Sequence, residues 1–555
     1  MLVDGDAEAI PQLPPTIQAL LAARLDGLDP PERTVLQRAA VVGRTFWSGS
    51  VVDLVPSDVR PDVGALLLAL ARKELIEPEP STIAGEDSFR FRHALIRDAA
   101  YAALPKASRG ELHERFALWL EQRTGEDELV GYHLEQAHRF RAELGVPDLE
   151  IATRAGSLLA AAGRRAFARD DMPAALNLLE RALGLAELDE ERPELLRELA
   201  AARWAAGDVT IAHDLLDEAI RRAADRGNVR EEWYGRLERA ARDHATHTGR
   251  DELVEVATEA IAVFESIDDD LGLARAWRRL ALASHTSCRF ADAASQSERA
   301  LRHAQRTGDA AEEARIVDVL CSALLFGPEP ARSAIVRCRS LLEAAGSNRV
   351  LEAAVRSTLA GLEAMQENVA TARDEAARAA TTYDELGLRL LRAGLAEIIA
   401  TSELLAGETG RAEQELRLSY DILEAADAGA LLAIPAARLA SLSIAEGRLH
   451  EAERLLAVAE RGLDPADPLA LAVSRQAAAE LAAAHGGTTE AAQLAQEAVD
   501  ALADGDAPGL RADALALVAM LAGAEPEEAL ELYTAKGNLA AAERLRALAL
   551  ARVTR

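Results

Sequence analysis

The chain contains very few of the residues with which proteins hydrolyse nucleotides. A phosphate-binding loop needs a lysine directly after a glycine and before a serine or threonine. The 555 residues include only three lysines, which follow an arginine, a proline and an alanine: Lys73, Lys106 and Lys536. The nucleophile elbow of hydrolases and the glycine-rich dinucleotide fingerprint are absent as well. We therefore predict a non-enzymatic chain with no catalytic residues and no cofactor of its own.

Histidine and cysteine spacing does not indicate a metal site. His133 and His138 lie five residues apart, whereas two zinc ligands on one helix face lie four apart, with the glutamate directly after the first histidine. Cys288, Cys321 and Cys338 are too far apart in sequence for a thiolate motif. We expect no metal ligands, and we expect the cysteines to be buried as small apolar residues.

One segment concentrates positive charge. Residues 88–123 carry seven basic and four acidic side chains, a local net charge of +3 in a chain of net charge −30. Arg90, Arg92 and His93 stand at its start and are our candidates for contacting a phosphate group. The alternative is that His93 ends a strand and bonds a backbone carbonyl, while the arginines form a solvated face.

Composition predicts an all-helical protein. The chain is 49% apolar but only 4% aromatic, and alanine and leucine supply most of the apolar residues. The net charge of −30 argues against nucleic acid and membrane surfaces as general partners. The longest uncharged apolar stretches, residues 63–71 and 514–524, are too short to span a membrane. The first residues are acidic, unlike a secretory signal, so we predict a cytoplasmic protein.

A repeat governs the chain from residue 151 onward. Short polar turns between apolar, alanine-rich helical segments recur at residues 171, 208, 250, 290, 329, 367, 408, 447, 487 and 525, at intervals of 37 to 42 residues. A helical hairpin of this length cannot bury its apolar stripe alone, whereas stacked hairpins can. The sequence therefore predicts a superhelical solenoid of about ten repeats of about 40 residues over 151–555.

The repeat units resemble tetratricopeptide repeats. In one unit, Ala274 and Trp277 precede the turn, and Ala291, Ala294 and Ala300 follow it. The tetratricopeptide period of about 34 residues is shorter, and longer helices would account for the difference. HEAT-like units share the period of about 40 residues, but the Gly-Asp and Gly-Arg turns before alanine-rich helices favour the tetratricopeptide-like interpretation.

A row of aromatic residues marks the first helices of successive predicted hairpins. In tetratricopeptide arrays these helices line the concave surface. Trp204, Tyr234 and Trp277, with Arg278 beside the last, are therefore candidates for a groove that binds a peptide or protein partner. The alternative, which we favour because aromatic side chains most often serve burial, is packing between hairpins.

The first 150 residues do not share the repeat. Apolar residues at helical spacing cover 13–28, 32–44 and 63–75, residues 89–93 alternate as in a strand, and a further helix covers 94–101. Two or three helices with a pair of strands describe a winged helix. We therefore expect four segments: a linker helix (1–30), a winged-helix-like domain (31–124), a connecting helix (125–150) and the solenoid (151–555).

The ordered features of residues 10–140, including the stretch Gly131–Ala137, resemble the winged-helix segment of STAND-class signal-transduction ATPases. The similarity is to the bacterial type that joins an ATPase to a class III adenylate or guanylate cyclase and to helical repeats. The C-terminal stretch Leu532–Asn538 fits the same type. The resemblance implies that residues 1–30 follow an ATPase core, and neither this core nor the cyclase is in the sequence.

The resemblance also implies a role for His93. In this class the histidine after the last strand of the winged helix touches the β-phosphate of bound ADP and holds the molecule closed. Here it stands in Arg92-His93-Ala94, where the commoner pattern has Met-His-Asp, so the acid is missing and only the histidine's role carries over. ADP or ATP would be held by a missing or partner ATPase domain.

Two functions follow from these observations. The first is a non-catalytic regulatory module, in which the solenoid binds a protein, peptide or small-molecule signal and the winged helix docks on a nucleotide-binding domain in the same or another chain. The alternative is a DNA-binding transcription regulator with a repeat effector domain. The +3 segment supports the alternative, and the overall charge of −30 opposes it.

Overall fold

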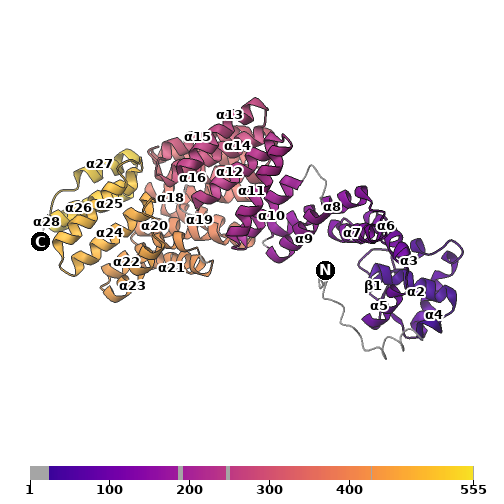
Figure 1. Ribbon diagram of the computed structural model, residues 1–555. Helices are drawn as coiled ribbons and strands as arrows, with labels where there is room; N and C mark the ends of the chain where they lie inside the picture. Colours follow the sequence, from indigo (N-terminus) through magenta and orange to yellow (C-terminus); the bar gives the residue numbers. More distant parts are fainter. Residues whose placement is uncertain (1–23, 170, 186–191, 246–249, 427, 554–555) are drawn as a thin grey trace. The chain divides into compact units, whose positions relative to one another are not determined.

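The computed structural model describes residues 24–169, 171–185, 192–245, 250–426 and 428–553. It divides into two compact units, residues 1–235 and 236–555, which we describe separately (Figure 1). Within the described ranges, no helix combines the length and the apolar character needed to cross a bilayer. The predicted helix over residues 13–28 lies mostly outside the described residues.

The first unit begins with a small helical domain that carries a sheet. Its elements are α2 (Pro30–Val42), β1 (Thr45–Trp47), α3 (Ser48–Leu54), α4 (Val63–Arg72), β2 (Ile76–Glu79) and β3 (Ser88–Phe91). The strands are antiparallel in the order β1-β3-β2. The sequence predicted only a pair of strands, because a strand of three residues is too short to show alternation. Fully buried Phe46 and Phe91 anchor β1 and β3 over the apolar faces of the helices.

The rest of the first unit is helical. After the sheet come α5 (Ala94–Ala102), α6 (Lys106–Glu121), α7 (Asp127–Glu143), α8 (Leu149–Ala168), α9 (Met172–Leu185), α10 (Arg192–Ala205) and α11 (Val209–Asp225), and α12 (Val229–Ala245) crosses the boundary between the units. Neighbouring helices pack as antiparallel hairpins. Small residues permit the close approach: a Cβ at Gly163 would lie 2.9 Å from the Leu179 side chain. The helix predicted over residues 94–101 is present as α5, and the range 125–150 holds α7 and the start of α8.

The second unit is a regular array of helical hairpins. It comprises α13 (Arg250–Ser266), α14 (Asp270–Thr286), α15 (Phe290–Thr307), α16 (Ala310–Phe326), α17 (Ala331–Ala344), α18 (Arg349–Met365), α19 (Val369–Glu385), α20 (Arg389–Leu405), α21 (Thr409–Ala425), α22 (Gly429–Ala445), α23 (Leu449–Gly462), α24 (Pro468–Ala484), α25 (Thr488–Ala501), α26 (Pro508–Ala522), α27 (Glu527–Lys536) and α28 (Leu539–Val553). The first helices of successive hairpins start at residues 270, 310, 349, 389, 429, 468 and 508, so the spacing is 39 or 40 residues. The predicted period is confirmed.

Backbone geometry explains where the hairpins turn. Gly407 and Gly447 adopt the left-handed conformation (φ of 82° and 75°) that ends one helix and redirects the chain into the next. Glu367 and Cys288 occupy the equivalent places with φ of 65° and 54°. A turn needs a left-handed residue here, and the sequence supplies glycine at most but not all of these positions.

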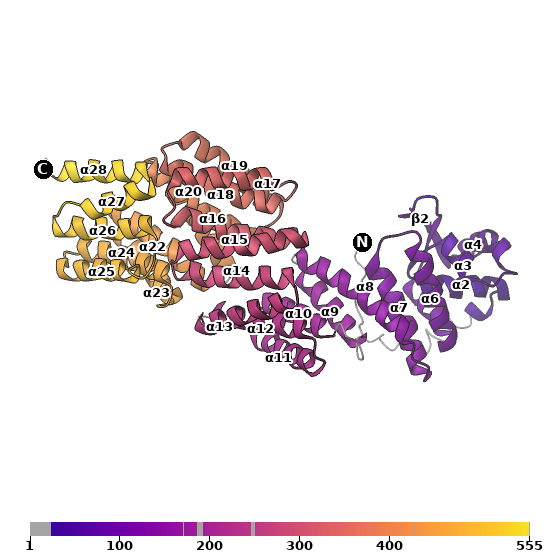
Figure 2. The same cartoon turned by 90° about the horizontal axis from the view of Figure 1, so that it is seen from above.

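The array of the second unit closes on itself. Asp506, before α26, accepts hydrogen bonds from the backbone N–H groups of Phe290 (2.6 Å) and Ala291 (2.9 Å), and its own N–H donates to the Cys288 carbonyl (2.9 Å). At the end of α27, the Lys536 ammonium donates to carbonyls of the segment that joins α16 to α17. Helices far apart in sequence therefore come into contact, as α28 does with α18 and α20 (Figure 2).

Candidate functional site

The predicted phosphate-contacting histidine lies at a helix start. His93 takes the N-cap position of α5 with extended backbone (φ −134°, ψ 133°). Its ring is exposed and has no hydrogen-bond partner among the residues that the structure describes. Among these residues, no backbone carbonyl therefore accepts a hydrogen bond from the His93 ring.

The arginines before it are already paired. Arg90 forms an ion pair with Glu77, which faces it across the β2-β3 ladder, and this contact lowers the pKa of Glu77. Arg92 lies 3.3 Å from Glu74 and 3.6 Å from Glu77. The positive charge counted along residues 88–123 is thus offset in space by acids from before residue 88, which a count along that segment does not include.

The aromatic groove candidates of the first unit are covered by neighbouring side chains. Tyr234 on α12 is only 6% exposed, and the Arg197 guanidinium lies 5.5 Å from its ring centroid. Trp204 on α10 is half-buried, with its ring centroid 5.7 Å from that of His213 on α11. Both residues stand on first helices of hairpins, as predicted, and both make packing contacts within the unit.

The candidates of the second unit are also engaged. Trp277 packs against the buried face shared by α14, α15 and α16, and the Arg299 guanidinium covers its ring at 4.7 Å. Arg278 donates at 2.6 Å to Glu312, whose carboxyl group is almost fully buried, and the pKa of Glu312 is lowered although burial acts to raise it. These contacts are typical of packing between hairpins.

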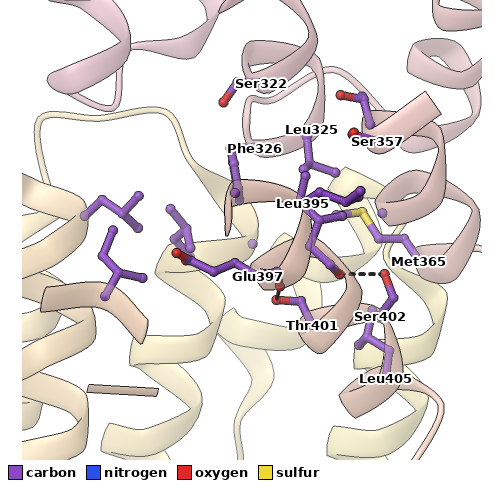
Figure 3. Close-up of a pocket in the computed structure, with 18 of the residues that line it drawn as sticks. Ser322, Leu325, Phe326, Ser357, Met365, Leu395, Glu397, Thr401, Ser402 and Leu405 are labelled. Atoms are coloured by element: carbon purple, nitrogen blue, oxygen red, sulfur yellow. Dashed lines mark hydrogen bonds between the residues drawn. The ribbon is translucent and has the colours of Figure 1, made fainter. Parts of the chain in front are cut away.

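A cavity of about 350 Å³ lies inside the second unit (Figure 3). The first helices of successive hairpins (α16, α18, α20, α22, α24 and α26) line it, together with α19 and α27. Small residues, among them Ala354, Gly394 and Gly509, leave the space open. The size is in the range of pockets that bind small organic molecules.

The closure of the array supplies part of the wall of this cavity. Lys536 is almost fully buried at its wall and donates three hydrogen bonds of 2.8 to 2.9 Å, to the carbonyls of Leu324, Gly327 and Glu329. Burial lowers the pKa of this lysine to about 8. Gln366 at the end of α18 donates to the Gly537 carbonyl at 2.5 Å. All three N–H groups of the Lys536 ammonium are therefore bonded within the protein, and none is directed at a ligand.

Three carboxyl groups line the cavity: Asp318 on α16, Glu397 on α20 and Asp513 on α26. Burial raises the pKa of each, that of Asp318 to about 6. The Asp513 carboxylate accepts a hydrogen bond from the Tyr533 hydroxyl, and Glu397 accepts one from Ser419 at 3.3 Å. Figure 3 shows Glu397 extending from α20 into the space between the helices.

Besides Lys536, one cation stands among the described lining residues. Arg438 on α22 lowers the pKa of both Glu397 and Asp513 by its charge, and its guanidinium donates at 2.7 Å to the Thr401 hydroxyl. The Ser322 hydroxyl at the cavity is bonded to His285 at 2.6 Å, and burial lowers the pKa of that histidine to about 4. The cavity therefore combines apolar walls with an excess of acidic groups.

Sequence reasoning missed this cavity. A signal was available, because two of the acids interrupt an apolar helical stretch: Asp318 stands in Ile-Val-Asp-Val-Leu and Glu397 in Leu-Ala-Glu-Ile-Ile. An acid on the inner face of a solenoid helix has either a partner or a hollow beside it. Which of the two applies depends on helices far away in sequence.

Comparison with known proteins shows the fold. No family model matches the chain, and no curated protein matches its sequence. A crystal structure of a STAND protein with a tetratricopeptide repeat sensor from Pyrococcus horikoshii matches with a TM-score of 0.50 and 15% identity over 80% of this chain. The apo form of RapI (TM-score 0.34, 11% identity, 55% of this chain and 97% of that one) and the APC/C component Cut9-Hcn1 (0.40, 13%, 80% and 88%) also match. The chain spans 65% of the STAND protein's length.

The fold class follows from the structure and these matches together. The second unit and the later helices of the first are hairpin repeats of the tetratricopeptide-like kind, and the small sheet lies near the N-terminus. The three cysteines are buried, as predicted. Within the described ranges, no cluster of histidine, cysteine or acidic side chains has the arrangement of a metal site.

Proposed function

We propose that this chain is the non-catalytic regulatory module of a signal-transduction ATPase and that its repeats receive the activating signal. The observation that carries the proposal is the cavity of the second unit, with its three acids and apolar walls. Solenoids of stacked hairpins commonly bind ligands or peptides on their concave surface. A signal bound there would favour one arrangement of the repeats over another through its differential contacts.

We also propose that residues 31–124 form a winged helix that docks on a nucleotide-binding domain. The order helix, strand, two helices and two strands, with β3 between β1 and β2, supports this assignment. So does the exposed ring of His93 directly after β3. The ADP or ATP itself would be held by the ATPase domain, in cytoplasm, and the missing acid after His93 leaves the histidine as the phosphate-contacting group.

The chemistry of α4 opposes the alternative of a DNA-binding regulator. In helix-turn-helix proteins the second helix of the motif reads bases with polar and basic side chains. Here that helix is α4, which runs Val-Gly-Ala-Leu-Leu-Leu-Ala-Leu-Ala-Arg, with Leu68 59% exposed and Arg72 at its very end. Such a face suits contact with a protein rather than with a base edge.

The test of the docking proposal is association in solution. The full chain is mixed with the ATPase domain encoded in the same or an adjacent reading frame, in ADP and without nucleotide, and complex formation is measured by analytical size exclusion. We expect a complex that ADP strengthens and that His93→Ala weakens about tenfold or more. His450→Ala, at a fully exposed histidine of the second unit, is the matched control.

The outcomes separate the two functions. Absence of a complex with the unmodified chain contradicts the docking proposal. In parallel, electrophoretic mobility of a random DNA duplex at low salt is measured with the same preparation, and salt-sensitive retardation would favour the transcription regulator.

A further inference from the structure

The three acids of the cavity differ in their partners. Asp513 has the Tyr533 hydroxyl, and Glu397 has the Ser419 hydroxyl, with Arg438 acting on both by charge. Asp318 has none of these: no hydrogen bond or ion pair reaches its carboxyl group from any residue that the structure describes. Among the three acids, Asp318 is therefore the one whose carboxylate oxygens can accept hydrogen bonds from a ligand.

Its position makes this unusual. Asp318 lines the cavity and keeps an exposed surface, yet the surrounding protein raises the pKa of its carboxyl group. Its neighbours in the wall offer no positive charge. The Ser357 hydroxyl donates to the Ala353 carbonyl at 2.9 Å, and the Ser322 hydroxyl is bonded to His285. An enclosed carboxylate without a donor is costly, and a donor from outside the chain would relieve this cost.

The remaining wall is apolar. Side chains of α16, α18, α20, α24 and α26 supply it, including Leu325, Phe326, Met365, Leu395 and Leu510. Figure 3 shows Leu325, Leu395 and Met365 gathered on one side of the space, with Glu397 on another. A ligand for this cavity therefore needs an apolar body and a group that donates hydrogen bonds to an acid.

We propose that the cavity binds a small organic cation, a protonated amine with an apolar body, whose ammonium group contacts the Asp318 carboxylate. This inference rests on the proposed function and names the chemical class of the signal. The charge of the lining favours it, since three acids stand against two cations, Arg438 and Lys536, and the Lys536 ammonium group is bonded to three carbonyls. A carboxylate ligand would meet these acids and be repelled, and a neutral ligand would leave the charge of Asp318 unbalanced.

The test uses three probes with the same apolar body and different head groups. The full chain is titrated by calorimetry at pH 7.5 with 2-phenylethylammonium, 2-phenylethanol and 3-phenylpropionate. We expect the ammonium compound to bind about ten to a hundred times more tightly than the alcohol, because a charge-assisted bond to a carboxylate is gained. The carboxylate compound should bind weakest.

Two variants test whether Asp318 causes the preference for the ammonium compound. Asp318→Asn should reduce the preference for the ammonium compound over the alcohol to within about twofold, while alcohol binding persists because the apolar wall is intact. Asp374→Asn is the matched control, because that acid on α19 is 70% exposed on its side chain and does not line the cavity. It should leave all three affinities unchanged.

Each outcome either supports or overturns the proposed ligand class. Ammonium selectivity that Asp318→Asn removes supports the proposal. Equal or tighter binding of the alcohol or the carboxylate compound, selectivity that survives Asp318→Asn, or no binding of any probe overturns it. None of these results bears on association with the ATPase domain, so failure of the ligand class and failure of the regulatory function remain distinguishable.

Discussion

A polar cluster in the first unit and a cavity acid in the second unit differ in whether their hydrogen-bonding groups have partners. In the first unit, His113 on α6 and His133 on α7 join their Nδ1 atoms at 2.8 Å, and the Tyr101 hydroxyl lies 2.7 Å from His113 Nε2. If the tyrosine donates to Nε2, then His113 Nδ1–H donates to His133, so this chain of bonds is complete. In the second unit, Asp318 has no such partner.

This difference in hydrogen bonding distinguishes polar groups with a structural role from polar groups that can bind a ligand. A fully bonded polar cluster in a packed core, such as the histidine pair beside Phe116 and Phe140, specifies how helices fit together. An unbonded acid beside a cavity contributes nothing to packing and leaves room and bonding capacity for a ligand. Motif searches detect neither case, because both depend on which side chains meet.

The largest expected effect on stability comes from removing the buried ammonium group whose three hydrogen bonds are all formed. Lys536→Ala leaves three carbonyls without their donor and a void at the cavity wall. We expect the free energy of unfolding of the second unit to fall by about 3 kcal/mol. The midpoint of urea unfolding measures it. Lys106→Ala, at an exposed lysine paired with Glu143, should change it by less than about 0.5 kcal/mol. Equal effects would contradict the role of the buried lysine.

Breaking the histidine cluster should have the next largest effect. His113→Phe preserves the aromatic contact with Phe140 but orphans the Tyr101 hydroxyl and His133 Nδ1. We expect a loss of about 2 kcal/mol. A double-mutant cycle with Tyr101→Phe should show that the two losses are not additive, because both variants remove the same bond. Additive losses would mean that the bond contributes nothing.

Acid should destabilise the first unit. Burial lowers the pKa of His113 to about 3 and that of His133 well below its usual value, so the unfolded chain takes up protons below pH 6.5 while the folded chain does not. Stability is present above this pH and is lost as the pH falls. Each histidine should contribute a loss of about 1.3 kcal/mol between pH 7 and 5.5. Unfolding midpoints at the two pH values measure it, and His113→Phe should reduce the dependence.

The smallest expected effect has the opposite sign. Asp318→Asn removes an enclosed charge whose pKa burial raises to about 6. Because the side chain is exposed to the cavity, water screens part of the cost, and we expect a stabilisation of only about 0.5 to 1 kcal/mol in the empty protein. Differential scanning calorimetry at pH 7.5 checks it. A marked destabilisation would show that Asp318 has a structural partner and would remove the contrast with the histidine cluster.

Ligand binding should depend on pH through the same acid. The proposed contact needs the Asp318 carboxylate, so affinity for 2-phenylethylammonium should be constant above pH 7 and fall about tenfold per unit below pH 6. Among the described residues, Tyr383 and Cys321 interact electrostatically with Asp318. Burial raises the pKa of Tyr383, and a hydrogen bond with Cys338 together with burial raises that of Cys321, so neither titrates in this range. Glu397, Asp513 and Arg438 also face the cavity, and calorimetry of Asp318→Asn separates their part.

The sequence by itself determined the regular features of this protein. The helical composition, the period of about 40 residues and the places of the turns follow from local patterns, since alanine and leucine at helical spacing and left-handed turn residues act within one hairpin. It also indicated the helices on either side of the sheet. The short strand β1 was missed because its partner, β3, lies more than forty residues away.

The tertiary structure alone decided which polar groups have partners. Arg90 and Arg92 looked available along the sequence, yet acids of β2 and its preceding turn neutralise them, while Asp318 looked like any other helix-surface acid. The closure of the second unit through Asp506 and Lys536 joins segments about 210 residues apart and brings together walls of the cavity. Such contacts depend on the total of the small rotations between successive hairpins. This total cannot be predicted from the residues of any single hairpin.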